Sequence, residues 1–329
     1  MSEISELERA EAETAGASPA PFVRPDTAML LAMLASAGAP PVNELPLAEG
    51  REAYRMMRFV VDAEPTPLAI VRDLSCPGPA GDIALRYYDA RETREAGPAI
   101  MFFHGGGFVI GDLDTHHAFC TEMAAQMDLP LVAVDYRLAP EHPFPAAPDD
   151  CEAAARWLAA NGKDLGPDIT GLIFTGDSAG GNLAIVTTQA LVARPAAVPV
   201  IAQAPLYPVV DSTAASGSFV EFAEGYLLTS GAMDWFTNHY AATPGNPRND
   251  CILGDIASLP PTLLVTAGLD PQRDQGRAFA ARAITAGVDV SYLEMRGTIH
   301  GFICLRKGVP SAQDDCDAIF RALKAMLNR

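Results

Sequence analysis

The chain has 329 residues, a formal net charge of −18 at pH 7, 49% hydrophobic residues and 19% charged residues. This balance excludes a disordered chain, because it supplies enough apolar surface for a large core. The negative charge argues against nucleic acid and anionic membranes as partners, since both are bound by clustered Lys and Arg. At about 150 residues per domain, the length fits two domains or one large α/β domain with an insertion.

The N-terminal segment and the cysteines predict a cytoplasmic protein. Residues 1–10 are acidic and lack the basic and apolar parts of a secretory signal. The most apolar segment, at 28–35, is shorter than the ~20 residues that cross a bilayer, so we expect no membrane span. The six cysteines include no Cys-x-x-Cys pair, which fits neither a zinc site nor a disulfide framework. We therefore expect reduced thiols and no metal.

From residue 70 onward, short apolar runs alternate with longer helical patterns, as in βαβ units and mostly parallel sheets. We predict eight strands, at residues 69–74, 83–88, 99–103, 131–134, 172–175, 200–203, 262–266 and 288–293. Helices are predicted at residues 117–126, 149–160, 179–192, 274–286 and 312–327. The first two strands alternate apolar and polar residues, which indicates antiparallel pairing at an edge of the sheet.

Two segments interrupt this alternation. One is residues 1–65, and the other is residues 209–245, which contains an aromatic helix at 232–240. We predict that residues 66–329 form the main α/β domain, with 1–65 as an N-terminal cap segment and 209–245 as a cap insertion. Both would fold over one end of the sheet.

Ser178 lies in the segment Gly176-Asp177-Ser178-Ala179-Gly180-Gly181, directly after a predicted strand and before a predicted helix. This context predicts a sharp turn that holds the serine in a strained conformation above the sheet. Glycines are needed on either side, because a Cβ there would collide with the neighbouring strand or helix. The helix N-terminus behind the serine also stabilises negative charge. The alternative is a strand-to-helix turn that uses small residues only for packing.

Three successive glycines follow another predicted strand, in the segment His104-Gly105-Gly106-Gly107-Phe108. Backbone N–H groups in such a loop can face an oxyanion or a phosphate. Neither Gly-x-Gly-x-x-Gly nor Gly-x-x-x-x-Gly-Lys-Ser/Thr occurs here, which argues against the phosphate. We predict an oxyanion hole formed by the amides of Gly106, Gly107 and Ala179.

A serine nucleophile needs a base and a group that orients the base. His300 is the best placed histidine, because it lies in a loop after the last predicted strand. Asp270 follows another strand and precedes a proline that fixes the turn, which gives the chain order Ser, Asp, His. Asp274 is the alternative acid, although a position at the start of a helix also accounts for it.

The other histidines fit supporting roles. His104 begins the glycine loop and is expected to brace it. His116, His117 and His142 are expected to cap helices or form local hydrogen bonds. His239 lies in the predicted cap helix, where packing or exposure to solvent is the simplest expectation.

These motifs resemble the hormone-sensitive lipase family of esterases, in the branch whose serine motif reads Gly-Asp-Ser-Ala-Gly-Gly. The resemblance covers about residues 100 to 303, in family order: the glycine loop, the segment 135–147, the serine motif, Asp270-Pro271 and His300-Gly301-Phe302. Two positions depart from it, because family members commonly carry Leu and Glu where this chain has Gln272 and Gln275. The second change removes a carboxylate near the acid loop.

The resemblance implies an α/β-hydrolase fold, an eight-stranded mostly parallel sheet flanked by helices, with a helical cap. It also implies hydrolysis of short- to medium-chain carboxylic esters without a cofactor, so a small-molecule ester is the expected partner. Ser178 would attack the carbonyl, His300 would accept the proton and Asp270 would orient the imidazole. The alternatives are a binding protein on the same fold and a hydrolase of amides, thioesters or lactones. A homodimer through the last strand is common in similar proteins.

Seven residues beside the motifs are candidates for lining the substrate pocket. Packing inside the protein is the alternative for most of them. They are Phe108, Asp177, Tyr207, Tyr226, Leu227, Ile299 and Phe302.

Overall fold

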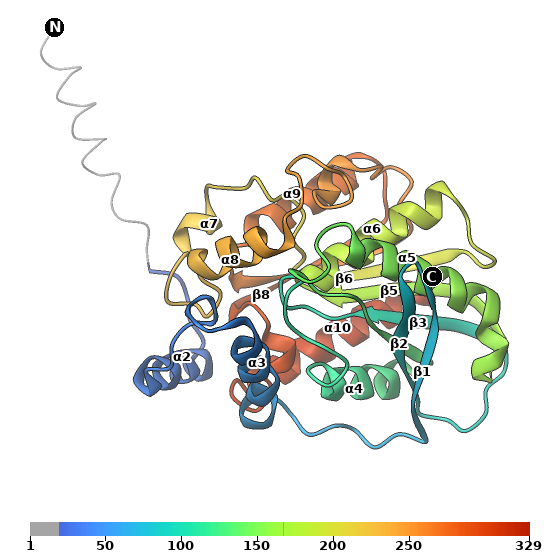
Figure 1. Ribbon diagram of the computed structural model, residues 1–329, viewed down its shortest axis with the longest axis horizontal. Coiled ribbons are helices and arrows are strands. Elements are labelled where there is room, and N and C mark those ends of the chain that lie inside the picture. The colour runs from blue at the N-terminus through green and yellow to red at the C-terminus, as the bar shows by residue number, and fades with distance from the viewer. Residues whose placement is uncertain (1–19, 167) are drawn as a thin grey trace, which may run out of the picture.

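The computed structural model describes residues 20–166 and 168–329, in which eight strands form one sheet (Figure 1). The spatial order is β1-β2-β4-β3-β5-β6-β7-β8. β2 runs antiparallel to both of its neighbours, and every later pair is parallel. This confirms the predicted α/β class and the eight-stranded, mostly parallel sheet. The strands are β1 (Ile70–Gly78), β2 (Gly81–Asp89), β3 (Gly97–Phe103), β4 (Leu131–Asp135), β5 (Ile169–Asp177), β6 (Val200–Leu206), β7 (Thr262–Leu269) and β8 (Val290–Ile299).

Helices cover both faces of the sheet, and each face has its own hydrophobic core (Figure 1). Successive residues of the central strand β5 show the division, because Ile173 packs in one core and Phe174 in the other. Since side chains alternate along a strand, a continuously apolar strand supplies both cores. One face carries α4 (His117–Met127) and α10 (Ser311–Leu327), and the other carries α5 (Ala146–Asn161), α6 (Ala179–Ala193) and α9 (Arg273–Thr285).

The largest difference from the predicted elements is the last strand, which was expected to end at residue 293 and continues to Ile299. Gly297 has a positive φ of 74°, and the β7–β8 register shifts between Ala267 and Leu269. An irregular strand of this kind passes through an Arg-Gly pair that looks like a loop in the sequence. His300 therefore follows the end of the strand directly.

The segment before β1 forms α2 (Pro25–Ala37), the 3₁₀ helix η1 (Val42–Glu44) and α3 (Leu47–Val61). Residues 1–19 of the predicted cap segment lie outside the described residues. The predicted insertion carries the short helix α7 (Ser218–Glu221) and the aromatic helix α8 (Ser230–Tyr240). The two segments meet where α8 contacts η1.

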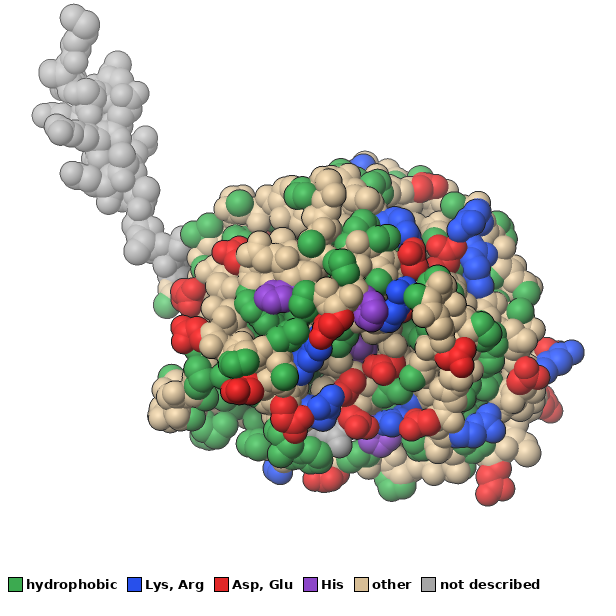
Figure 2. All heavy atoms as spheres, viewed as in Figure 1, with side chains coloured by type: hydrophobic (Ala, Val, Ile, Leu, Met, Phe, Trp, Pro, Cys, Tyr) green, Lys and Arg blue, Asp and Glu red, His purple; other side chains and the backbone are tan. Residues whose placement is uncertain are grey.

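Arg51 fixes α3 to the main domain. Its guanidinium donates to the carbonyl oxygens of Val109 at 2.9 Å and Ala139 at 3.0 Å, and it pairs with Glu141. Val109 lies just after the glycine loop, so α3 is connected to a loop that the sequence analysis assigned to the active site. Figure 2 shows hydrophobic side chains gathered over α2 and α3, where Met29 is exposed.

Within residues 20–166 and 168–329, no helix combines the length and the apolar character that a bilayer crossing needs. The six cysteines are free and buried, as expected for packing residues. β8 forms one edge of the sheet, and the expected pairing of two copies through this strand stays a prediction.

Candidate active site

Ser178 occupies the turn between β5 and α6 and has φ 55° and ψ −117°. A residue other than glycine rarely adopts this conformation, which lies outside the usual allowed regions and stores strain. The neighbouring backbone packs closely against this turn. A Cβ on either Gly176 or Gly180 would collide with the carbonyl oxygen of Phe103. The two glycines thus allow the tight approach that the sequence predicted.

A continuous chain of hydrogen bonds connects Ser178, His300 and Asp270. His300 Nε2 lies 2.8 Å from Ser178 Oγ, and His300 Nδ1 lies 2.7 Å from Asp270 Oδ2. The other carboxylate oxygen of Asp270 accepts the backbone N–H of Gln272 at 2.8 Å. With Nδ1 donating to the carboxylate, Nε2 is free to accept the serine proton. The arrangement can therefore deprotonate Ser178 and stabilise the imidazolium that results.

The three side chains come from distant parts of the sequence and meet at one edge of the sheet. Ser178 follows β5, Asp270 follows β7 and His300 follows β8. These strands are parallel, so their carboxyl ends lie together. This is the edge at which open α/β sheets usually bind ligands.

The glycine loop lies beside this group and presents unpaired amides. Gly106 and Gly107 have φ values of 116° and 60°, and a Cβ on Gly106 would collide with the carbonyl of Ile110. None of the hydrogen bonds found among the described residues uses the N–H of Gly106 or Gly107. Ala179 is the first residue of α6, where an N–H has no partner within the helix. All three amides are thus free to bind an anion.

Asp177 ties the glycine loop to the serine turn. Its Oδ1 accepts the N–H of Gly105 at 2.8 Å and lies 3.0 Å from Nε2 of His116. Burial acts to raise the pKa of Asp177, but His116 and the hydrogen bond from Gly105 outweigh it and lower the pKa below its usual value. The carboxylate is almost inaccessible to solvent. Asp177 therefore connects the serine turn to the glycine loop from inside the protein.

His116 forms the local hydrogen bond that was expected, and it also has a second, distant contact. His116 does bond to its neighbour Thr115, whose Oγ1 lies 2.9 Å from Nδ1, but its other nitrogen contacts Asp177. No sequence pattern connects these two positions, because the contact depends on how the loop after β3 folds back toward β5.

His104 braces the glycine loop, as the sequence analysis expected. Its Nδ1 lies 2.8 Å from the carbonyl oxygen of Gly105, and its ring stacks on Tyr136 with centroids 4.3 Å apart. Burial, together with the nearby His116, lowers the pKa of His104 to about 4. His104 is thus neutral at neutral pH and adds no charge to the glycine loop.

The predicted pocket residues occupy different environments. Ile299 and Phe302 are fully buried in the core that faces α4 and α10. Tyr207 is also buried. Its ring contacts the His300 ring edge to face, with centroids 4.8 Å apart. Phe108 stacks on Tyr240 of α8 with centroids 3.9 Å apart.

The remaining two candidates, Tyr226 and Leu227, belong to the insertion. The Tyr226 ring contacts Phe222 at a centroid distance of 5.1 Å. Leu227 has a positive φ of 73° and is 38% exposed. Leu227 is thus a strained, exposed leucine in the predicted cap insertion.

Phe236 is a neighbour of the site that the sequence analysis missed. It lies on α8, and a Cβ built on Gly107 would collide with its ring. The ring therefore packs directly against the glycine loop. Sequence alone gave no reason to choose it over Trp235, because both aromatic residues belong to the same helix.

Asp274 and Gln275 have structural partners away from His300. Asp274 Oδ2 accepts the N–H of Ser218 at 2.9 Å, which attaches α7 to α9. Gln275 Oε1 accepts the N–H groups of Val210 and Asp211 at 2.7 and 2.9 Å. An uncharged amide satisfies these two donors, so the loss of the family's carboxylate leaves no buried donor unpaired here.

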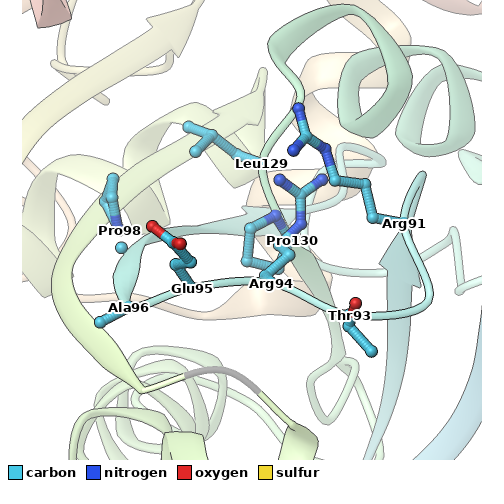
Figure 3. A pocket seen from close by; sticks show the side chains of 9 residues that line it. Arg91, Thr93, Arg94, Glu95, Ala96, Pro98, Leu129 and Pro130 are labelled. Carbon is cyan, nitrogen blue, oxygen red and sulfur yellow. The ribbon is translucent and has the colours of Figure 1, made fainter.

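A cavity of about 510 Å³ lies elsewhere in the molecule (Figure 3). Gly97 and Pro130 line it, at the amino ends of β3 and β4, so it opens at the opposite end of the sheet from Ser178. Its two arginines, Arg91 and Arg94, both pair with Asp128. The cavity is therefore separate from the serine site.

A family model described as alpha/beta hydrolase fold matches residues 100–304, which include Ser178, Asp270 and His300. The chain belongs to the α/β-hydrolase fold family. This α/β hydrolase is 38% identical to the carboxylic ester hydrolase LipN of Mycobacterium tuberculosis, over 83% of this chain and 75% of that protein. It is 34% identical to the ethyl acetate hydrolase of Pseudomonas putida, over 87% and 92% of the two chains. These relatives confirm the resemblance to the hormone-sensitive lipase family of esterases.

Solved structures of esterases have the same fold as this α/β hydrolase. One is an ester hydrolase from the metagenome of Lake Arreo, solved with a derivative of bipyridine phosphonate. It has a TM-score of 0.88 and 38% sequence identity, over 94% of this chain and 100% of that one. A second is an esterase from the archaeon Pyrobaculum calidifontis, with a TM-score of 0.86 and 34% identity over 93% and 99% of the two chains.

Proposed function

We propose that the protein is a serine carboxylesterase that hydrolyses short- to medium-chain esters through an acyl-enzyme. One observation carries this proposal: Ser178, His300 and Asp270 are hydrogen-bonded in series, at 2.8 and 2.7 Å, beside a glycine loop with free amides. A serine, a base and an orienting carboxylate next to such donors are the parts that acyl transfer requires.

In the proposed reaction, His300 takes the proton of Ser178 as Oγ attacks the ester carbonyl. The negative charge on the carbonyl oxygen is stabilised by the amides of Gly106, Gly107 and Ala179. His300 then gives its proton to the departing alcohol, which leaves an acyl group on Ser178. A water molecule, activated by the same histidine, hydrolyses this acyl-enzyme and restores the free serine.

The relatives' names favour esters over the alternatives. Amides, thioesters and lactones would use the same machinery, but the printed names include a carboxylic ester hydrolase and an ethyl acetate hydrolase. A protein that only binds ligands has no need of the Ser178–His300–Asp270 hydrogen bonds, which argues against the binding alternative.

We further propose that α2 and α3, together with α7 and α8, form a cap over the site. Contact of α8 with η1, and of Phe236 with Gly107, supports this arrangement. Ser178 and His300 are only 8% and 9% exposed, which supports a cover over the site. Six free, buried cysteines suit the reducing conditions of the cytoplasm, which is the proposed location.

Initial rates on p-nitrophenyl esters from acetyl to palmitoyl test the proposed activity. We expect rapid turnover that falls as the acyl chain lengthens, because Ser178 and His300 have little exposed surface and Phe236 packs against the glycine loop. Folded protein that hydrolyses none of these esters would contradict the proposal. A preference for palmitoyl over acetyl esters would contradict the proposed chain length only.

Replacing Phe236 with Ala is expected to favour larger acyl groups. Removing the ring opens space beside Gly107, and differences of a methylene in an apolar pocket are worth about 1–3 kcal/mol. We expect the ratio of kcat/KM for octanoyl over acetyl esters to rise about 10-fold or more. Val220→Ala is a matched control, because Val220 is a cap residue that is 66% exposed. An unchanged ratio in Phe236→Ala would remove this residue from the substrate pocket.

A further inference from the structure

The Asp177 carboxylate is a buried charge that the proposed mechanism does not use. It is 3% exposed and lies between the serine turn and the glycine loop. A buried carboxylate is costly unless charged or polar groups satisfy it. Gly105 N–H supplies one hydrogen bond at 2.8 Å, and the hydroxyl of Tyr207 is 3.5 Å from the other oxygen. The remaining close partner is His116.

His116 is held in one orientation by its surroundings. Its side chain is 2% exposed, and the rings of Phe102 and His104 lie 5.7 and 5.8 Å from it. Thr115 Oγ1 binds Nδ1 at 2.9 Å, so Nε2 is the nitrogen that faces Asp177, at 3.0 Å. A ring that is held in place 3.0 Å from a buried carboxylate limits the positions that the carboxylate can adopt.

This arrangement continues outward to the N-terminal cap segment. Thr115 donates its N–H to Asp112 Oδ1 at 2.8 Å, and Arg55 of α3 donates to Asp112 Oδ2 at 2.7 Å. His116 therefore belongs to a polar network that begins in the cap and ends at the residue before Ser178.

We propose that His116 is a positioning residue for ester hydrolysis: by fixing the Asp177 carboxylate, it holds the Gly105 amide and thereby aligns the glycine loop that binds the oxyanion. This inference rests on the proposed function. His116 touches neither the substrate nor the reacting atoms in this scheme. It acts on the loop through Asp177.

The proposal predicts an effect on kcat rather than on KM. The oxyanion exists only in the transition state and the tetrahedral intermediate, so misalignment of its donors leaves ground-state binding largely intact. Loss of one oxyanion donor costs about 10²–10³ in kcat, and displacement of the loop should cost less. For His116→Ala we expect kcat to fall about 10–100-fold, with KM within about threefold of its original value.

Two further variants separate positioning from a general structural role. His116→Gln keeps a polar side chain with N–H groups beside Asp177, and we expect it to recover most of the lost kcat. Asp177→Asn removes the buried charge. Combining it with His116→Ala should therefore lower kcat no further than Asp177→Asn alone, since both changes break the same connection.

The decisive experiment measures kcat and KM on p-nitrophenyl acetate for these four variants, with active sites counted by a p-nitrophenyl phosphonate. Phe119→Leu serves as the stability control, because Phe119 is fully buried in α4, the helix that follows His116, and packs on Phe320. Full-length proteins are used, and melting temperatures are recorded for each. If His116→Ala does not fold, His116→Gln and Asp177→Asn carry the test.

The outcomes are distinct. A kcat loss in His116→Ala that His116→Gln restores, and that Phe119→Leu does not reproduce at an equal fall in melting temperature, supports the positioning role. Unchanged kcat, a change in KM alone, additive losses in the double variant or an equal loss in Phe119→Leu overturns it. Absence of ester turnover in the wild-type protein would refute the proposed function itself. The wild-type protein is measured first, so this outcome is distinguished from failure of the positioning role.

Discussion

Replacing Ser178 with Ala should abolish ester hydrolysis and leave the fold intact. Loss of the nucleophile in a serine triad costs about 10⁶ in kcat, since only binding and the oxyanion donors remain. Alanine retains the Cβ, so it meets the same steric limits at φ 55° as serine does. We therefore expect kcat to fall by about 10⁵–10⁶ with little change in the unfolding temperature.

The measurement compares initial rates on p-nitrophenyl acetate with circular dichroism and thermal unfolding of the same preparations. Ser212→Ala is the matched control, because Ser212 is an exposed serine in the loop after β6. It should retain wild-type kcat. Turnover by Ser178→Ala at more than about 1% of the wild-type rate, in protein free of host esterases, would contradict the assignment of the nucleophile.

The parts of the site that sequence predicted are those whose geometry depends on short segments. Ser178 could be assigned because glycines on both sides of a serine, between a strand and a helix, describe one particular turn. The structure has this turn, and the backbone of Phe103 excludes a Cβ at both glycines. His300 and Asp270 follow from the same logic, since the carboxyl ends of parallel strands converge at one edge of the sheet.

The contacts that sequence did not predict join segments whose relative positions depend on the whole fold. His116 meets Asp177, and Phe236 meets Gly107, because the loop after β3 and the insertion after β6 fold over the same strand ends. Each of these residues also has an adequate local explanation, as a helix-start histidine or a packing aromatic. Local patterns therefore gave only part of the role of each residue, as the hydrogen bond between His116 and Thr115 shows.

The sheet was predicted more accurately than the segments around it for a similar reason. A strand buried on both faces, such as β5, carries an apolar run at its centre, Leu172-Ile173-Phe174, that the sequence displays. α3 has mixed composition and is fixed by long-range bonds from Arg51 to Val109 and Ala139, which no helical pattern reveals. The bulged end of β8 is likewise set by its pairing with β7.

Replacing Asp270 with Asn should have the second largest effect. The carboxylate accepts a hydrogen bond from His300 Nδ1 at 2.7 Å, which keeps Nε2 unprotonated and directed at Ser178. An amide can instead donate to Nδ1, which favours the tautomer with the proton on Nε2 and removes the base. The comparable change in a serine protease lowers kcat about 10⁴-fold, and we expect a loss of about 10³–10⁴ here.

Asp274→Asn gives the control that distinguishes the two acids of this loop. Asp274 accepts the N–H of Ser218 and pairs with Arg273 and Arg277, so its charge stabilises the junction of α7 and α9. Those arginines hold the pKa of Asp274 below its usual value, against the opposing effect of burial. We expect Asp274→Asn to lower the melting temperature slightly and to keep kcat within about threefold of wild type, because it lies outside the proton path. If instead Asp274→Asn lost kcat and Asp270→Asn kept it, the orienting acid would be Asp274, and the bond between His300 and Asp270 would be structural.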